Sequence, residues 1–187
     1  MIISITGTPG VGKTTLSKFL SKKLGYSVIH ITDFVREKNL SSGYDKSFKA
    51  VIIDVKKLNR EMKKFLKDRD NLIIDGHLSH FIPSDITFVI RLDPSLLARR
   101  LRRRGYPRKK ILENIEAELL DVIYAEALNN SKNVIQINAT SKKREKIINQ
   151  MLSAIKGRFK GDQVDWLSKY SDVRKFERRL FKFKKSK

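Results

Sequence analysis

The chain has 187 residues, the length of one ordinary α/β domain with a short appendage. It contains no cysteine, which excludes disulfides, thiolate metal sites and cysteine nucleophiles. Its net charge of +21 predicts attraction to polyanions such as RNA, although a lysine-rich surface that only keeps the protein soluble would give the same excess.

The first segment predicts a strand, a glycine-rich loop and a helix. Residues 1–6 are a mostly apolar run typical of a buried strand, and residues 13–24 favour a helix. Residues 7–14 (GTPGVGKT) fit the pattern G-x-x-x-x-G-K-[ST] at every constrained position. Glycines let such a loop turn its N–H groups toward phosphate oxygens at a helix N-terminus. Nucleoside triphosphate binding is therefore predicted; the alternative is a glycine-rich turn with a coincidental lysine.

The following residues predict further strands that alternate with helices. The expected strands are 27–31, 71–75, 86–92 and 133–137, and the expected helices are 32–38, 54–67, 95–103, 108–128 and 142–155. The polar residues 39–48 favour a loop. Five short apolar strands in this alternation predict a three-layer α/β fold whose parallel sheet is covered on both faces. The phosphate loop, Asp33 and Asp75 should then meet at one edge of the sheet.

The residues after position 156 are rich in Lys and Arg and stand apart from this pattern. Asp172 could cap a basic helix that docks on the core, binds RNA or binds a partner, with apolar positions Val173, Phe176, Leu180 and Phe183. Trp166, the only tryptophan, is interpreted as a hydrophobic anchor for this tail. We expect one domain over residues 1–156 and a basic helical extension over residues 157–187.

Four residues have the chemistry of a phosphate site. Lys13 supplies a charge for the outer phosphates, and the Thr14 hydroxyl suits Mg²⁺ coordination. Asp75 ends a buried strand opposite the loop, where it would orient Mg²⁺ through water. Dedicated ATPases often follow this Asp with a glutamate; here Gly76 and His77 follow instead, and the His77 imidazole could position water or a phosphate. The alternative for His77 is a purely structural hydrogen bond.

The arginines before residue 105 suggest how the negative charge of a phosphoryl group could be stabilised during its transfer. Arg100 and Arg104 are four residues apart, so on a helix they would face the same way and offer fixed positive charge. The Gly-Tyr-Pro run at 105–107 permits the bend of a mobile cover. A basic helix surface is the preferred interpretation of Arg99, Arg102 and Arg103.

Asp33 and Arg36 follow the second predicted strand and could hold a second phosphate, that of the acceptor molecule. His30 and His80 have no such placement and are interpreted as structural. No cluster of histidines predicts a metal site.

These features together resemble the nucleoside monophosphate kinases. More narrowly, they resemble the adenylate kinase isoenzyme 6 family, which comprises the coilin-interacting nuclear ATPase protein and its archaeal relatives. The resemblance covers about residues 1–156 and rests on GTPGVGKTT at 7–15, DFVRE at 33–37, DGH at 75–77, RGY at 104–106, KKI at 109–111 and ENI at 113–115. Ordinary adenylate kinases instead look like Asp-Gly-Phe-Pro-Arg at the third strand and carry a long lid insertion, and this chain has neither.

The resemblance implies adenylate kinase activity with Mg²⁺-ATP as donor and AMP as preferred acceptor, together with ATPase activity. It implies an acceptor-binding region at about 32–55 and a short lid at about 103–113. Carried over by position, the ATP phosphates would be held by Gly10, Val11, Gly12, Lys13, Thr14 and Thr15.

The same comparison assigns roles to residues farther along the chain. Asp75 would orient Mg²⁺, and His77 would assist hydrolysis. Arg36, beside Asp33, would reach the acceptor phosphate. Arg104, with Arg100, would cover the donor, and Ser141 would lie by the adenine.

The resemblance also implies a role in maturation of the small ribosomal subunit. The partners would be a platform ribosomal protein and, through the basic lid and tail, pre-ribosomal RNA. Two alternatives remain: a purely metabolic nucleoside monophosphate kinase, and an RNA- or protein-binding assembly factor that uses ATP as a switch. No apolar run is as long as a membrane span, and no export signal is visible. We therefore expect no membrane partner and a cytoplasmic location, with nuclear relatives in eukaryotes.

Overall fold

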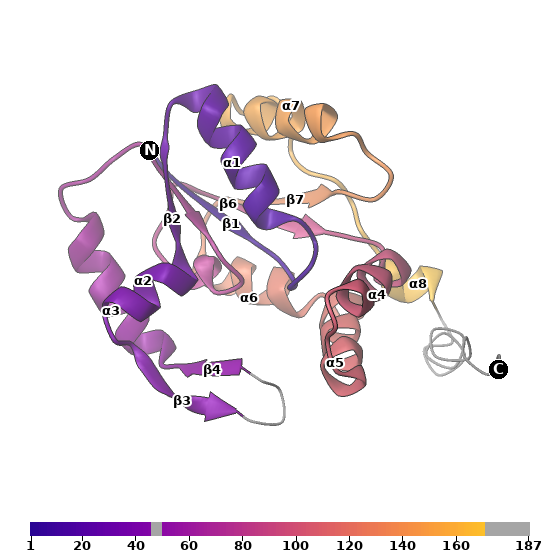
Figure 1. The fold of residues 1–187 in the computed structure, drawn as a ribbon. Helices are drawn as coiled ribbons and strands as arrows, with labels where there is room; N and C mark the ends of the chain where they lie inside the picture. The colour runs from indigo at the N-terminus through magenta and orange to yellow at the C-terminus, as the bar shows by residue number, and fades with distance from the viewer. Residues whose placement is uncertain (46–49, 171–187) are drawn as a thin grey trace.

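The computed structural model describes residues 1–45 and 50–170. Its centre is a five-stranded sheet in the order β2-β5-β1-β6-β7, with every neighbouring pair parallel (Figure 1). The strands are β1 (Ile2–Thr6), β2 (Ser27–His30), β5 (Leu72–Asp75), β6 (Ile86–Arg91) and β7 (Val134–Asn138). The predicted α/β fold with five parallel strands is thereby confirmed.

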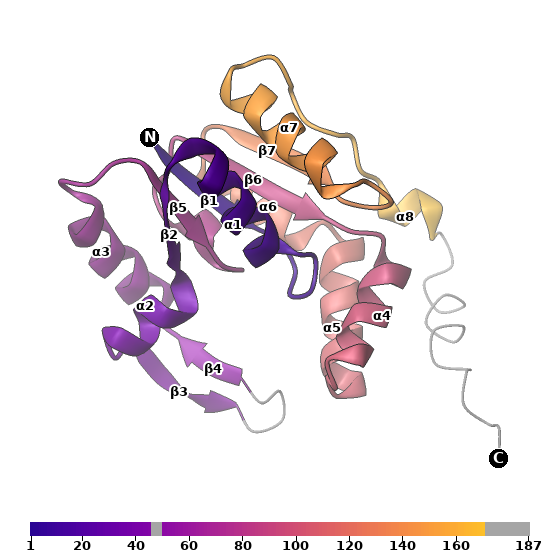
Figure 2. The same cartoon turned by 45° about the horizontal axis from the view of Figure 1, so that its top comes forward.

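Helices cover both faces of this sheet. They are α1 (Lys13–Leu24), α2 (Ile31–Glu37), α3 (Val55–Leu66), α4 (Pro94–Arg103), α5 (Arg108–Leu119), α6 (Val122–Asn130), α7 (Arg144–Ile155) and the short α8 (Trp166–Lys169), with a 3₁₀ turn η1 (Ser79–Phe81). Helices α1 and α7 pack side by side on one face, and α6 lies behind β6 and β7 on the other (Figures 1 and 2). Every residue of β6 is buried, which explains why this strand reads as a nearly continuous apolar run.

The strand register brings the carboxyl ends of β1, β2 and β5 together. Ile5 of β1 and His30 of β2 both pair with Asp75, the last residue of β5. Two groups of elements extend from this edge on either side of the loop that follows β1: α2 with strands β3 and β4, and the pair α4 and α5 (Figures 1 and 2). The predicted meeting of the phosphate loop, Asp33 and Asp75 at one edge agrees with this arrangement.

The prediction of a loop over residues 39–48 is wrong for its described part. Strands β3 (Ser41–Asp45) and β4 (Ala50–Ile53) form an antiparallel hairpin, with a register shift near Gly43. Ser-Ser-Gly has little strand propensity of its own, and its pairing with the apolar AVII of β4 overrides that preference. Leu40, just before the hairpin, is buried in the same apolar cluster as α2 and α3.

The single helix predicted over residues 108–128 is two helices. Leu119 ends α5, and Asp121 takes a left-handed conformation (φ 56°) before α6 begins. The Asp121 carboxylate accepts a hydrogen bond from the buried guanidinium of Arg91, which holds the chain in this conformation. Helix propensity is a local property of the sequence. It therefore gives no sign that Asp121 has a partner on a distant strand.

After α7 the chain runs without regular structure to α8, and residues 157–170 are called the C-terminal strap below. Trp166 is buried, in agreement with its interpretation as an anchor. The helix predicted from Asp172 lies outside the described residues. Within the part of the chain that the structure describes, no helix is both long and apolar enough to cross a membrane.

Candidate active site

A cleft of about 910 Å³ lies at the carboxyl edge of the sheet. The phosphate loop forms its floor, α2 and the β3–β4 hairpin line one wall, and the α4–α5 turn with α5 lines the other. A second hollow beside α7 is lined mostly by polar side chains and contains none of the predicted site residues.

The glycines of the phosphate loop take conformations that other residues rarely adopt. Gly7, Gly10 and Gly12 have φ angles of 135°, 99° and 116°. A Cβ atom on Gly7 would lie 2.4 Å from the carbonyl oxygen of Ile90, so any side chain there would push the loop away from β6. The glycines of the motif are therefore required by backbone geometry and by close packing.

Lys13 lies across the loop that precedes it. Its Nζ donates hydrogen bonds to the carbonyl oxygens of Gly7 at 2.7 Å and Thr8 at 3.2 Å. Burial lowers the pKa of Lys13 to about 8, against the raising effect of the Asp75 and Glu118 carboxylates. The ammonium is thus held at the floor of the cleft with reduced solvation.

Asp75 gathers polar groups from two other elements. Its Oδ2 accepts hydrogen bonds from the Thr14 hydroxyl at 2.7 Å and from Nδ1 of His30 at 2.8 Å. Its Oδ1 is buried, and none of the described residues donates to it. A buried carboxylate oxygen with unused acceptor capacity, next to a hydroxyl, suits water bound to Mg²⁺. The residues present therefore fit the predicted metal.

His77 stands two residues beyond Asp75 and lines the cleft. Desolvation, followed by the charge of Lys13, lowers the pKa of His77 to about 4, so its ring is neutral at pH 7. A Cβ on the intervening Gly76 would lie 2.9 Å from that of Ile31. The glycine is what allows the chain to turn between the two functional side chains beside α2.

Arg100 of α4 and Arg104, the residue that follows this helix, lie differently. Arg100 donates from Nη1 to the carbonyl oxygens of Gly10 at 3.2 Å and Val11 at 2.9 Å, so it supports the loop backbone. Arg104, just past the end of α4, lines the cleft together with Tyr106 and Lys110. Burial and the nearby charge of Arg104 lower the pKa of Arg100.

The residues predicted to bind the acceptor and the adenine do not all line the cleft. Asp33 lines the cleft, whereas Arg36 pairs with Asp33 at 3.0 Å on an exposed surface and is not among the described lining residues. Ser141, which has a left-handed backbone (φ 55°), is not among them either. The roles of Arg36 and Ser141 stay predictions.

Two parts of the cleft were not predicted from the sequence. His30 is a partner of Asp75 and lines the cleft, rather than a remote structural histidine. Its position at the end of a strand was the available signal, because parallel strand ends meet at one edge. Val51 and Ile52 of β4 add an apolar wall and are half exposed. The run AVII after a supposed loop was the signal for this strand.

Solved structures support the architecture. A shikimate kinase from Bacteroides thetaiotaomicron superposes with a TM-score of 0.59 at 17% identity, covering 83% of this chain and 98% of that one. A deoxyadenosine kinase from M. mycoides gives 0.56 at 19% identity, covering 84% and 99%. At these identities the likeness shows the fold alone. With the loop and the sheet order, it defines a P-loop kinase fold of the type that nucleoside monophosphate kinases share.

Sequence relatives define the family. A family model described as an AAA domain matches residues 3–121. A protein of Thermococcus kodakarensis named "Putative adenylate kinase" is 43% identical over 175 residues, covering 92% of this chain and 97% of the relative. A protein of the same name from Methanocaldococcus jannaschii is 40% identical, covering 92% and 96%. The chain belongs to this archaeal family of nucleotide kinases.

Proposed function

We propose that the protein transfers the γ-phosphoryl group of Mg²⁺-ATP to AMP and also hydrolyses ATP. The observation that carries this proposal is the form of the cleft. The phosphate loop, with Lys13 and the unsatisfied Asp75 oxygen, forms its floor, and α2 and the β3–β4 hairpin line one wall. A cleft of about 910 Å³ has room for a donor and an acceptor whose phosphates face each other.

In this reaction an oxygen of the AMP phosphate bonds to the γ-phosphorus while the bond to the β–γ bridging oxygen breaks, giving two ADP. The main task of the protein is positioning and charge stabilisation. Lys13 and the loop N–H groups would bind the donor phosphates, and Arg104 would cover the transferred group. Mg²⁺, held by Thr14 and through water by Asp75, would neutralise phosphate charge. Arg36 and Asp33 would position the acceptor.

Hydrolysis would use the same donor site with water in place of AMP. The neutral imidazole of His77 can accept a hydrogen bond from a water molecule and so orient it. The Asp-x-His pattern at residues 75–77 is the most specific reason for proposing membership of the adenylate kinase isoenzyme 6 family.

We further propose that the protein acts in small ribosomal subunit maturation, with a platform ribosomal protein and pre-ribosomal RNA as partners. The net charge of +21 supports a polyanionic partner, since a small nucleotide does not require it. A purely metabolic kinase and an ATP-dependent assembly switch are the competing functions.

A coupled phosphotransfer assay with AMP, CMP, GMP and UMP, each with and without added RNA, tests these functions. We expect AMP to be the best acceptor and RNA to change turnover. Phosphotransfer unaffected by RNA would favour the metabolic kinase. Tight ATP binding with negligible turnover on every acceptor would favour the switch.

A further inference from the structure

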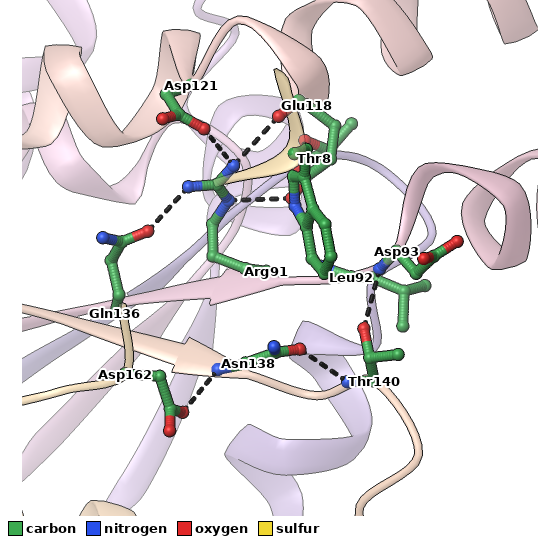
Figure 3. Close-up of polar contacts among 11 residues, drawn as sticks. Thr8, Arg91, Leu92, Asp93, Glu118, Asp121, Gln136, Asn138, Thr140 and Asp162 are labelled. Atoms are coloured by element: carbon green, nitrogen blue, oxygen red, sulfur yellow. Dashed lines mark hydrogen bonds and ion pairs between the residues drawn. The ribbon is translucent and has the colours of Figure 1, made fainter. Parts of the chain in front are cut away.

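A buried carboxylate outside the proposed chemistry connects three elements to the phosphate loop. Glu118 of α5 is 2% exposed. Its Oε2 accepts a hydrogen bond from the Thr8 hydroxyl at 2.5 Å. Its Oε1 accepts from Arg91 Nε at 2.8 Å, from the Leu92 N–H at 3.2 Å and from Trp166 Nε1 at 3.1 Å. Figure 3 shows the hydrogen bonds that Arg91 donates to Glu118. A loop residue and a strap residue thus bind the two oxygens of one carboxylate.

The charge of Glu118 is balanced by Arg91 of β6, whose side chain is also 2% exposed. Arg91 donates further hydrogen bonds to the Gln136 side chain at 2.6 Å and to the Asp121 carboxylate (Figure 3). The donors to Glu118 and the further partners of Arg91 thus form one connected hydrogen-bond network. Such a buried network holds its members in one geometry, because losing a partner leaves a desolvated group behind.

Thr8 connects this network to the charge at the floor of the cleft. Its hydroxyl is fixed by Glu118, and its carbonyl oxygen is one of the two that accept a hydrogen bond from Lys13 Nζ. The charge of Glu118 also raises the pKa of Lys13, against the larger lowering effect of desolvation. Glu118 therefore acts on the position of Thr8 and on the electrostatics of Lys13 without lining the cleft.

The strap reaches the loop by a second route, through α4. Asp93 caps this helix by accepting from the Ser95 N–H at 2.9 Å. Its carboxylate also binds Lys169 Nζ at 2.6 Å and the Tyr170 hydroxyl at 2.8 Å. The same helix carries Arg100, which binds the loop carbonyls. The strap thus supports the phosphate loop from two sides.

We propose that the C-terminal strap is a structural part of the ATP site, in which Trp166 and Glu118 are positioning residues that hold the phosphate loop in its ATP-binding shape. The proposal rests on the proposed function only in that the loop binds ATP. The sequence match to the archaeal relatives covers 92% of the chain, so it extends past residue 156 into this region.

The fluorescence of Trp166 provides the test, because it is the only tryptophan and is not among the described residues that line the cleft. Titration of the wild-type protein with Mg²⁺-ATP should change its emission. In Thr8→Val, which removes the hydroxyl at nearly constant volume, ATP should bind about tenfold more weakly and the emission change should be lost. Thr8→Ser retains the hydroxyl and should restore both.

Trp166→Phe keeps an aromatic ring and removes the hydrogen bond to Glu118, so calorimetry should again give about tenfold weaker ATP binding. AMP affinity should be unchanged, which a general loss of folding would not produce. The matched control is Leu167→Ala, at an exposed neighbour on α8, which should bind ATP like the wild type. Circular dichroism verifies that each variant is folded.

Unchanged ATP affinity in both Thr8→Val and Trp166→Phe would overturn the proposal, as would equal loss of ATP and AMP binding. A wild-type protein that binds ATP but transfers nothing to AMP would refute the proposed function instead. The binding measurements would still decide the role of the strap.

Discussion

The ammonium of Lys13 lies where its protonation should depend on the nucleotide. Burial lowers its pKa to about 8 in the nucleotide-free protein. Phosphate groups beside it would raise that pKa, since an opposite charge favours the protonated form. We therefore expect ATP binding at pH 8 to take up about half a proton. Calorimetry in buffers of different ionisation enthalpy measures this uptake.

ATP affinity should depend on pH through the protonation of Lys13. The pKa is lower without ATP than with it, so affinity should be constant well below pH 8 and should fall as pH rises above 8. Lys13→Arg is the control, because a guanidinium stays protonated across this range and should show no proton uptake. Absence of uptake in the wild type would mean that Lys13 is already fully charged or lies away from the phosphates.

His77 should matter more for hydrolysis than for transfer. In His77→Ala we expect a clear loss of ATP hydrolysis, on the order of the 10²-fold that one acid–base group supplies, and a smaller loss of AMP phosphorylation. Since the pKa of His77 is lowered to about 4, wild-type hydrolysis should not rise as the pH is lowered from 8 to 6. Parallel steady-state assays with and without AMP separate the two activities. Equal losses in both would contradict a separate role.

Some functional residues could be predicted from the sequence and others could not, for a physical reason. Lys13 and Thr14 belong to a loop whose shape is set by its own glycines, so a local pattern is sufficient. The contact of His30 with Asp75 depends on the register of β2 against β5. The contact of Glu118 with Thr8 joins residues 110 positions apart, and it depends on how α5 packs against the sheet.

At the scale of elements, Asp93 at the N-terminus of α4 should make the free energy of unfolding depend on pH in the acidic range. Burial of Asp93 raises its pKa, but hydrogen bonds from Lys169, Ser95 and Tyr170 outweigh this and lower the pKa to about 2. A carboxyl with a folded-state pKa below the unfolded value stabilises the protein above about pH 4, and this stabilisation is lost as pH falls toward 2.

The corresponding measurement is denaturant unfolding of the wild type and Asp93→Asn between pH 5 and pH 2. The wild type should lose about 2 kcal/mol more unfolding free energy across this window than the variant, which cannot titrate at position 93. Equal pH dependence in the two proteins would show that the Lys169 and Tyr170 contacts with Asp93 do not stabilise the fold.

The elements were predicted best where each one buries its own apolar face. Strands β1, β5 and β6 are apolar runs in the interior, and their positions were predicted within a residue or two. The β3–β4 hairpin was missed because Ser41 to Gly43 gain strand structure only through pairing with β4. The break between α5 and α6 was missed because it depends on Arg91, which belongs to a strand.

For the whole molecule, the positive charge of the residues after position 170 should be separable from nucleotide turnover. We expect a chain ending at Tyr170 to retain nucleotide turnover, because the strap and its contacts with Glu118 and Asp93 remain. Its affinity for RNA should fall, and the slope of log affinity against log salt should become less steep, since fewer basic residues displace counterions. Filter binding over a range of salt concentrations measures the slope. An unchanged slope would assign the basic residues after 170 to solubility alone.

The C-terminal strap also covers one edge of the central sheet. Strand β7 is an outermost strand, and its backbone groups would otherwise be available to pair with another chain. The N–H of Asp162 donates to the carbonyl of Gln136 at 2.9 Å, and the Asp162 carboxylate accepts from the N–H of Asn138 at 2.7 Å. Gly161 allows this approach, because a Cβ there would lie 3.2 Å from the Gln136 nitrogen. A chain shortened to residue 156 would thus carry an open edge along β7, and we expect it to self-associate through this edge.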